Sequence, residues 1–430
     1  MGKIKNIGIV TLGCSKNTVD SEVLAAQFAQ SGFNISFGNT EKSDVVIVNT
    51  CGFIGDAKQE SIETILHYLD QKKSGKLQKV LVMGCLIQRY ADELKAELPE
   101  VDGFFGVTDF SPMLKSLSAP HNRFSPENRL LSTPSHYAYL KISEGCDRRC
   151  AFCAIPLIRG GNASRSMKSL EKEALNLAAK GVKELNVIAQ DTTSYGVDLY
   201  GKRMLAPLLE KLAKTNAFEW IRLHYTFPAG FPEDVMDVIA ANPAMCKYID
   251  IPLQHISERI LRSMKRGMYE TGTRKLLEKI RNRIPGVSIR TAFIVGYPGE
   301  TRKEFNELLS FIKDQQFERA GVFTYSPEEG TAAYKLIDSV SEKTKQARAA
   351  ELMDIQQGIS AAHNQKRIGS TMKVLIDRIE DEHYIGRTEF DSPEVDNEVL
   401  IPVKDKKLRI GNFYDIRITG SEEFDLLGTV

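Results

Sequence analysis

One short motif constrains this chain more than any other feature: three cysteines with the spacing C-x3-C-x2-C, at Cys146, Cys150 and Cys153. They follow an apolar run, 137–143, that is typical of a strand. Three thiolates this close together can bind one face of a cubane iron–sulfur cluster, which usually has four cysteine ligands. One iron would then keep an open position for a small molecule. A structural zinc site is disfavoured, because it needs four protein ligands and the motif supplies three.

Three further cysteines share a different pattern, in which each follows a short apolar run: Cys14 after 7–12, Cys51 after 44–50 and Cys85 after 79–83. Such runs are typical of strands buried in a parallel sheet, and a helix-patterned stretch follows each of them (19–30, 57–69 and 87–98). The cysteines are 37 and 34 residues apart, which is about one βαβ unit. A buried free thiol would explain any one of them. Three in register predict a second three-thiolate site at the carboxyl edge of one sheet. The seventh cysteine, Cys246, is interpreted as a packing residue.

The composition is that of an ordinary globular protein. The 430 residues are 42% hydrophobic and 26% charged, with a formal net charge of +1. A net charge this close to zero does not indicate that the protein binds nucleic acid or a membrane surface. No apolar run approaches the roughly 18 residues of a membrane-spanning helix, and the N-terminus lacks a secretory signal. We therefore expect a cytoplasmic protein with reduced thiols.

The pattern of strands and helices predicts an α/β chain with three domains. Residues 1–115 form an open parallel α/β sheet, and 116–136, rich in proline and serine, form a linker. Residues 137–365 alternate between strands and helices six times, which predicts a partial (β/α)6 barrel with an open side. Its expected strands are 138–143, 184–190, 220–225, 248–253, 288–296 and 320–325. Its expected helices include 170–179, 207–212, 259–265, 303–312 and a final one at 341–367.

The last part, 366–430, is expected to be a small antiparallel β-barrel with strands at 372–377, 398–403 and 414–418. It carries 10 Lys and Arg against 14 Asp and Glu, a net charge of about −4. A barrel that gripped RNA should be basic, whereas an acidic one suits a basic protein partner. An ordinary solvated surface explains the same charges equally well.

The cysteine motif, with the aromatic Phe152 before its last cysteine, resembles the radical S-adenosylmethionine (SAM) enzymes. The upstream cysteines and the downstream barrel, similar to a TRAM domain, narrow the resemblance to the methylthiotransferases. Within this family the chain is most similar to the RimO-type branch. The motifs that carry the similarity are TLGCSKN (11–17), VDSE (19–22), YLKISEG (139–145), CAIP (153–156), DTTSYG (191–196) and DIPLQH (250–255).

The tRNA-modifying MiaB-type branch shares the cysteines but usually differs at two of these motifs. It has Gln-Met-Asn where this chain has Ser15-Lys16-Asn17, and Asn-Val-Asn-Ser-Tyr-Gly where this chain has 191–196. The segment 223–228 departs slightly from the family, which more often has Tyr-Pro there.

The resemblance implies two 4Fe–4S clusters and SAM as cofactors. It implies that SAM bound at the Cys146, Cys150 and Cys153 cluster yields a radical that takes hydrogen from the β-carbon of an aspartate in the small-subunit ribosomal protein S-twelve. Sulfur would come from the Cys14, Cys51 and Cys85 cluster and the methyl group from a second SAM. The implied partners are this ribosomal protein, bound through the acidic barrel, and an electron donor such as a flavodoxin or ferredoxin, while tRNA is not expected to be a partner.

Further candidates for SAM binding lie at the carboxyl ends of the expected barrel strands, where active sites of such barrels gather. They are Gln190 and Asp191 after the second strand, Gln254 after the fourth, Gly296 and Glu300 after the fifth, Phe152 against the adenine, and Arg165 against the carboxylate. Each has an ordinary structural explanation, since a Gly- and Pro-containing turn before a helix is often only a turn.

Two other functions fit part of the pattern. One is methylthiolation of a tRNA adenosine with the same clusters, which the modified substrate would distinguish. The other is a two-cluster electron-transfer protein without substrate chemistry, which would not produce 5′-deoxyadenosine from SAM. The open iron and the long barrel argue against the second.

Overall fold

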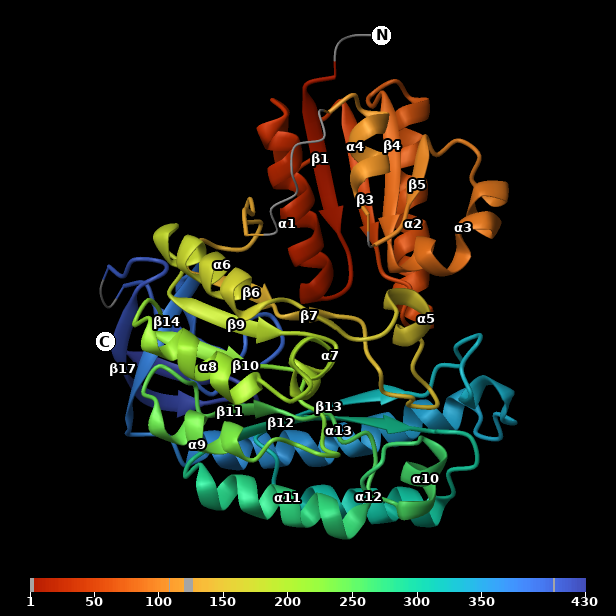
Figure 1. Cartoon of the computed structure of the whole chain (residues 1–430). Coiled ribbons are helices and arrows are strands. Elements are labelled where there is room, and N and C mark those ends of the chain that lie inside the picture. The colour runs from red at the N-terminus through yellow and green to blue at the C-terminus, as the bar shows by residue number, and fades with distance from the viewer. Residues whose placement is uncertain (1–3, 108, 120–126, 405–406) are drawn as a thin grey trace.

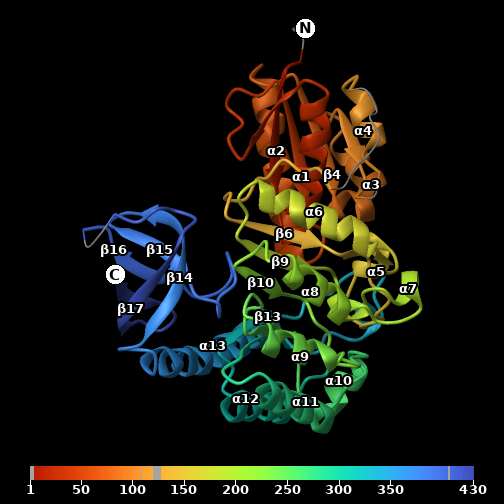
Figure 2. The ribbon, with the colours of Figure 1, turned by 60° about the vertical axis from the view of Figure 1, so that its left-hand side comes forward.

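The computed structural model describes residues 4–107, 109–119, 127–404 and 407–430. Figures 1 and 2 show an N-terminal sheet with its helices standing on a larger barrel-like part, and a small separate barrel at the C-terminus. No helix of these described ranges is long and apolar enough to cross a membrane.

The N-terminal part is the parallel sheet that the sequence predicts, with the strand order β2-β1-β3-β4-β5. Its strands are β1 (Asn6–Thr11), β2 (Asn34–Phe37), β3 (Val45–Thr50), β4 (Lys79–Gly84) and β5 (Gly103–Phe105). Its helices are α1 (Ser15–Gln30), α2 (Gly55–Lys73), α3 (Cys85–Glu97) and α4 (Ser111–Ser116). Strands β1, β3 and β4 and the three long helices lie where they are expected, although α1 begins four residues earlier and α2 ends four residues later. The short elements β2, β5 and α4 give too weak a periodic signal to be predicted.

The expected linker, 116–136, is partly a packed segment. Residues 120–126, with Pro120 and Pro126, lie outside the described residues. Arg129 is buried, and its Nε donates a 3.1 Å hydrogen bond to Glu22 of α1, while Nη1 donates at 2.7 Å to Glu173. The segment therefore ties the N-terminal sheet to the next part of the chain.

The central part contains the six expected parallel strands, arranged as two three-stranded sheets, β10-β9-β6 and β11-β12-β13. A single bridge between Ile221 and Met245 joins the halves, so that the sheets form an incomplete barrel. The strands are β6 (Tyr137–Lys141), β9 (Glu184–Ile188), β10 (Trp220–Leu223), β11 (Tyr248–Asp250), β12 (Ser288–Val295) and β13 (Arg319–Thr324), with a small extra pair, β7 (Ser143–Glu144) and β8 (Ala163–Ser164).

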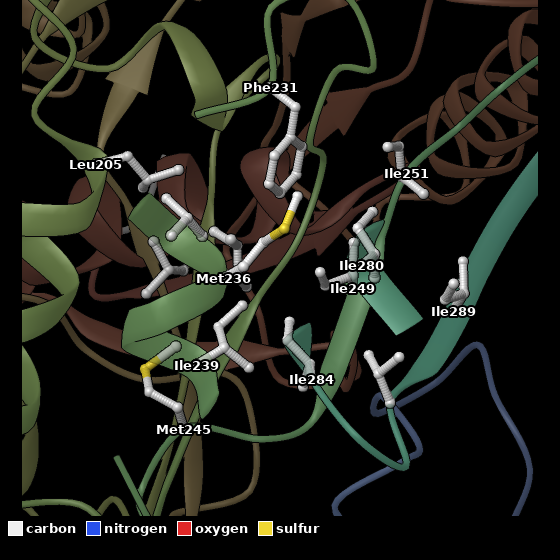
Figure 3. Packing of buried hydrophobic residues seen from close by; sticks show 14 of the residues in the cluster. Leu205, Phe231, Met236, Ile239, Met245, Ile249, Ile251, Ile280, Ile284 and Ile289 are labelled. Carbon is white, nitrogen blue, oxygen red and sulfur yellow. The ribbon is translucent and has the colours of Figure 1, made fainter. Parts of the chain in front are cut away.

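Most helices of the central part cover the outside of this incomplete barrel, whereas α5 (Ile155–Arg159) lies at its junction with the N-terminal sheet (Figure 1). The others are α6 (Met167–Ala179), α7 (Val197–Tyr200), α8 (Leu205–Lys214), α9 (Asp234–Ala241), α10 (Glu258–Ser263), α11 (Glu270–Arg283), α12 (Arg302–Gln315) and α13 (Glu342–Gln365). Two short 3-10 helices lie at Thr192–Ser194 and Ala333–Lys335. Figure 3 shows the apolar packing of strand residues such as Ile249 and Ile289 with Met236 of α9 and Ile280 of α11. Burial of this kind stabilises by about 25 cal/mol per Å² of apolar surface.

The C-terminal part is a closed barrel with the order β14-β15-β16-β18-β17. Its strands are β14 (Thr371–Glu380), β15 (His383–Arg387), β16 (Val399–Pro402), β17 (Phe413–Ser421) and β18 (Leu426–Thr429). The small barrel is confirmed, but it is not wholly antiparallel, because β16 and β18 pair in parallel. Strands β15 and β18 were not predicted; both are short and rich in glycine or charge.

The segment 388–397 between β15 and β16, which we call the plug, docks at the amino ends of the central strands. Asp391 accepts a 2.9 Å hydrogen bond from Nε of Arg319, the first residue of β13. Asp396 accepts from Arg290 Nε at 3.1 Å and from the Tyr248 hydroxyl at 2.7 Å. The plug therefore closes one mouth of the incomplete barrel and leaves the carboxyl ends of the strands for the site.

Candidate active site

The first triad, defined as Cys146, Cys150 and Cys153, lies in the loop between β7 and α5. Gly145 precedes it with φ +73°, and a Cβ there would lie 2.1 Å from the Gly161 carbonyl oxygen, so that only glycine fits. All three thiols are partly exposed. Burial, together with neighbouring charges, raises the pKa of Cys146 to about 11 and that of Cys153 to about 12; Cys150 contributes to the first rise, and Cys150 and Cys146 contribute to the second. The three sulfurs therefore lie within electrostatic reach of one another.

Hydrogen-bond donors face these sulfurs. The Arg148 amide donates to Cys146 Sγ at 3.4 Å, and Arg266 Nη1 donates to Cys150 Sγ at 3.3 Å. The guanidinium groups of both arginines also lie 4.1 Å from the centroid of the Phe227 ring. These donors and positive charges oppose the effect of burial on the thiol pKa values and stabilise the thiolates that a metal cluster requires as ligands.

The second triad, defined as Cys14, Cys51 and Cys85, lies at the carboxyl edge of the N-terminal sheet. The register pairs Thr11 with Asn49 and Thr50 with Gly84, so β1, β3 and β4 end side by side. Gly13 lies against the second cysteine: a Cβ there would be 2.9 Å from Cys51 Sγ. Cys14 is exposed, whereas the other two thiols are buried. Burial and, to a smaller extent, charge on the other two thiols raise the pKa of Cys51 to about 11.

The two triads lie near the junction of the N-terminal sheet and the central part. In Figure 1 the strands of the N-terminal sheet point down onto the central part. Arg159 of α5 spans the junction: its Nη2 donates to Asn17 at 2.6 Å and to Cys85 Sγ at 3.4 Å, and its Nη1 donates to Asp20 and Glu144 at 3.0 Å each. Glu144 precedes the first triad by two residues. One buried guanidinium thus connects the surroundings of both triads.

The first triad supplies three of the four ligands that a cubane iron–sulfur cluster usually has. Within the described residues, no group of three or more His, Cys, Asp or Glu side chains is placed to hold one metal ion. The histidine nearest the first triad in sequence, His136, is engaged elsewhere, since its Nε2 lies 2.8 Å from Asp377 of the C-terminal barrel. Three cysteines with surrounding donors therefore fit a cluster with one open iron.

Two of the predicted SAM-binding residues lie close to the first triad. Asp191 accepts a 2.7 Å hydrogen bond from Arg148 Nε and a 2.9 Å bond from the Thr193 amide. Gln190 donates from Nε2 to Glu144 at 2.6 Å, and among the described residues its buried Oε1 has no partner. Both positions face the site, and their role in binding SAM stays a prediction.

The candidates after β11 and β12 have structural roles. Gln254 has φ +74° and joins β12 through a backbone hydrogen bond from its amide to Ala292 at 2.8 Å. At Gly296 a Cβ would lie 2.3 Å from Lys345 Cγ, which explains the glycine by close packing of α13. The Glu300 carboxylate accepts from the Gly296 amide at 3.0 Å and from Arg348 at 2.6 Å. These contacts occupy Glu300 within the protein, and a contact with SAM stays a prediction.

The remaining two candidates lie among protein contacts. Phe152 packs, partly buried, against the apolar cluster that contains Met264 and Tyr297. Arg165 forms a 2.5 Å ion pair with Glu173 and donates to the Lys141 carbonyl at 3.1 Å. The structure thus gives Arg165 a counter-ion already. Cys246 is buried beside Trp220 and Tyr248, as a packing residue should be.

Sequence reasoning missed the charged residues that join the triads. Arg159, Asp20 and Lys141 come from three separate elements, and Lys141 pairs with both Asp20 and Glu144. The pKa of Glu144 falls to about 2, because Lys141 and Arg159 outweigh the opposing effect of burial. No local spacing in the sequence predicts a cluster of charged residues that come from separate elements. The only signal was that Asp20, Lys141 and Glu144 lie within the motifs 19–22 and 139–145, whereas Arg159 lies outside every motif.

Known families match all three parts of the chain. Residues 6–106 match Uncharacterized protein family UPF0004, 140–312 the radical SAM superfamily and 368–430 the TRAM domain. The ribosomal protein uS12 methylthiotransferase RimO of Flavobacterium psychrophilum is 53% identical over 426 residues, 99% of this chain and 98% of the relative. The RimO of Bacteroides thetaiotaomicron is 50% identical over 430 residues, 100% of this chain and 99% of the relative. The chain belongs to the RimO family.

Solved structures show the same fold in more distant proteins. The radical SAM methyltransferase TsrM of Kitasatospora setae has a TM-score of 0.55 at 14% identity, covering 75% of this chain and 77% of its own. The SAM radical enzyme OxsB has a TM-score of 0.52 at 12% identity, covering 83% of this chain and 56% of its own. As a RimO-family member the chain is a radical SAM methylthiotransferase that uses SAM and an iron–sulfur cluster, and the predicted family and enzyme class are confirmed.

Proposed function

We propose that this chain methylthiolates the β-carbon of an aspartate in ribosomal protein uS12. The observation that carries the proposal is full-length identity of about half to RimO proteins, which are named uS12 methylthiotransferases. The chemistry agrees with the site, since Arg159 connects the surroundings of the two cysteine triads through Glu144 and Cys85. Neither tRNA methylthiolation nor simple electron transfer is favoured by these relatives.

The first triad is proposed to hold a 4Fe–4S cluster, with SAM at its open iron. When bound, this pair supplies a carbon radical able to break a C–H bond that no acid–base residue could break. The protein's own residues exclude water and hold the reacting groups in place. Arg148 and Arg266 stabilise negative charge at the sulfurs, and the N-terminal sheet covers the carboxyl ends of the central strands.

The second triad is proposed to hold another 4Fe–4S cluster that takes part in sulfur delivery. Its support is the set of three thiols on adjacent strand ends and the donor from Arg159 to Cys85 Sγ at 3.4 Å. Cys14, the exposed member, lies on the side where a sulfur or methylthio group could enter. We propose that the domain 1–115 binds the second cluster, that 137–365 carries out the radical chemistry and that 366–430 binds the substrate. The linker 116–136 connects the first two domains.

Recognition of uS12 through the acidic barrel is a finer proposal, and the structure narrows the surface involved. In the plug, Asp396 accepts hydrogen bonds from Arg290 and Tyr248, and Glu394 accepts hydrogen bonds from two tyrosines of β6. The carboxylates of Asp396 and Glu394 therefore face inward. Glu380, Asp381 and Glu382, at the turn between β14 and β15, stay exposed. We propose this turn as the acidic contact for uS12. A flavodoxin or ferredoxin is the proposed electron donor.

The direct test is mass analysis of uS12 after anaerobic reaction with the reconstituted enzyme, SAM and a reductant. Addition of one methylthio group, localised to an aspartate by peptide sequencing, is expected. An anticodon-loop tRNA in a parallel reaction serves as the control and should remain unmodified. Modified tRNA with unmodified uS12 would contradict the proposal.

The acidic turn is tested separately by reversing the charges at Glu380, Asp381 and Glu382 to lysine. Association with uS12 should slow and lose its dependence on salt, because the attraction is screened over ~10 Å at 0.1 M salt. SAM cleavage without uS12 should be unaffected. Unchanged association and salt dependence would remove the turn from the interface.

A further inference from the structure

Lys16, two residues after Cys14 on α1, is a buried cation without a counter-ion. It is 7% exposed, and its ammonium lies 2.9 Å from the centroid of the Tyr225 ring. No carboxylate in the part of the chain that the structure describes lies within 4.0 Å of this ammonium. A cation–π contact stabilises a desolvated cation by about 2 kcal/mol or more, whereas burying an ammonium costs several kcal/mol.

The other cations of the junction differ from Lys16 in this respect. Lys141 pairs with Asp20 and Glu144, Arg159 pairs with the same two carboxylates, and Arg148 pairs with Asp191. Every nearby cation of this set has its anion within the chain. No carboxylate of the described residues pairs with Lys16, so its positive charge is available to an anion that enters the junction.

Helix α1 adds to this positive potential. Cys14 is its N-cap and makes no side-chain capping hydrogen bond. The N-terminal turn of a 16-residue helix carries a partial positive charge and free amide donors. Lys16 and the helix terminus thus act in the same direction at one place.

This place lies between the two triads. On one side, Cys14 belongs to the second triad. On the other, the Tyr225 carbonyl accepts a 3.0 Å hydrogen bond from the Thr192 amide, next to Asp191. Asp191 binds the side chain of Arg148, whose amide donates to Cys146 Sγ. Tyr225 itself has φ +55°, a costly conformation for an aromatic residue that places its ring below Lys16.

We infer that Lys16 binds the side-chain carboxylate of the substrate aspartate and so selects an anionic residue for modification. This inference rests on the proposed function. The carbon to be modified is one bond from that carboxylate, so a cation fixed between the triads holds the β-carbon between them. An ammonium offers three donors, and a charge-assisted hydrogen bond to a carboxylate is about twice as strong as a neutral one.

The test compares two labelled peptides of uS12, one with the target aspartate and one with asparagine in its place. Their binding to the reconstituted holoenzyme with SAM is measured by fluorescence anisotropy. The wild type should bind the aspartate peptide about 10- to 100-fold more tightly, the range expected for a hydrogen bond between charged groups. Lys16→Met, the residue usual in the tRNA-modifying branch, should reduce this preference to less than about threefold.

Two variants serve as controls. Lys16→Arg keeps the charge and should retain most of the preference for aspartate. Lys73→Met removes an exposed lysine from the last turn of α2, away from the site, and should leave the preference unchanged. Iron content and the melting temperature of every variant show whether folding and the clusters are intact.

Three results would overturn the inference. An undiminished aspartate preference in Lys16→Met would show that another group binds the carboxylate. Loss of about four irons in Lys16→Met would assign the lysine to charge balance at Cys14. Weaker SAM binding with an intact preference would assign it to the SAM carboxylate. Failure of the wild type to modify uS12 in the mass assay, by contrast, would reject the proposed function itself.

Discussion

Removing the carboxylate of Asp391 should loosen the plug. Asp391 is 1% exposed and accepts hydrogen bonds from Arg319 Nε at 2.9 Å and from the Thr388 hydroxyl at 2.5 Å. Burial alone would raise its pKa, but Arg319 and Arg367 hold the pKa below its usual value. The side chain is therefore charged at neutral pH and neutralises an arginine that is only 5% exposed.

The magnitude follows from the unpaired charge. Breaking a buried ion pair by removing one partner costs about 3–5 kcal/mol. Arg319 keeps a hydrogen bond to the Glu318 carbonyl at 2.7 Å and feels the charge of Asp396, so the lower end is expected. A loss of about 3 kcal/mol in the free energy of opening corresponds to roughly 100-fold more frequent opening of the plug.

Hydrogen exchange read by mass spectrometry measures this opening directly. In Asp391→Ala, amides of the plug and of β15 should exchange roughly 100-fold faster than in the wild type, while β1, β3 and β4 should be unchanged. Glu382→Ala, which removes an exposed carboxylate of the same barrel, is the matched control and should change the free energy of opening by less than about 0.5 kcal/mol. Exchange in Asp391→Ala within threefold of the wild type would show that this ion pair does not hold the plug in place.

Three further outcomes are expected. The reconstituted enzyme should hold about eight irons; replacing the first triad by alanines should leave about four and abolish SAM cleavage, and cleavage that persisted would withdraw its assignment. Replacing the second triad by alanines should preserve SAM cleavage but eliminate the methylthio product, and product from that variant would contradict the sulfur-delivery role. Because the pKa values of Asp377 and Asp391 are lowered in the folded state, their contribution is present above the ordinary value of about 4 and is lost as pH falls below it. Plug protection, corrected for intrinsic exchange, should thus be flat from pH 5 to 8 and fall below about pH 4; a decline that began near pH 6 would contradict the assignment to these two carboxylates.

Much of the fold could be predicted because its signals are local. Buried parallel strands appear in the sequence as short runs of β-branched residues. A cysteine after each of three such runs predicts three thiols at one edge of the sheet. The spacing of the first triad needs no tertiary information, since its members lie within eight residues. Short or partly exposed strands such as β2 and β18 were not predicted, because four residues with a mixed pattern of apolar and polar side chains cannot be distinguished from a loop in the sequence.

Sequence alone determined the three parts, the two triads and the family resemblance, because each depends on neighbours in the chain or on a repeated unit. Only the tertiary structure decided which charges meet. Arg159 contacts Asp20, which is 139 residues away in the sequence, and Asp391 contacts Arg319, which is 72 residues away. No spacing rule predicts either pair. The tertiary structure also decides that Asp396 faces inward and that Lys16 has no carboxylate partner among the described residues. The physical reason is that periodicity fixes which face a residue occupies, whereas the partner of a charge depends on how separate elements dock.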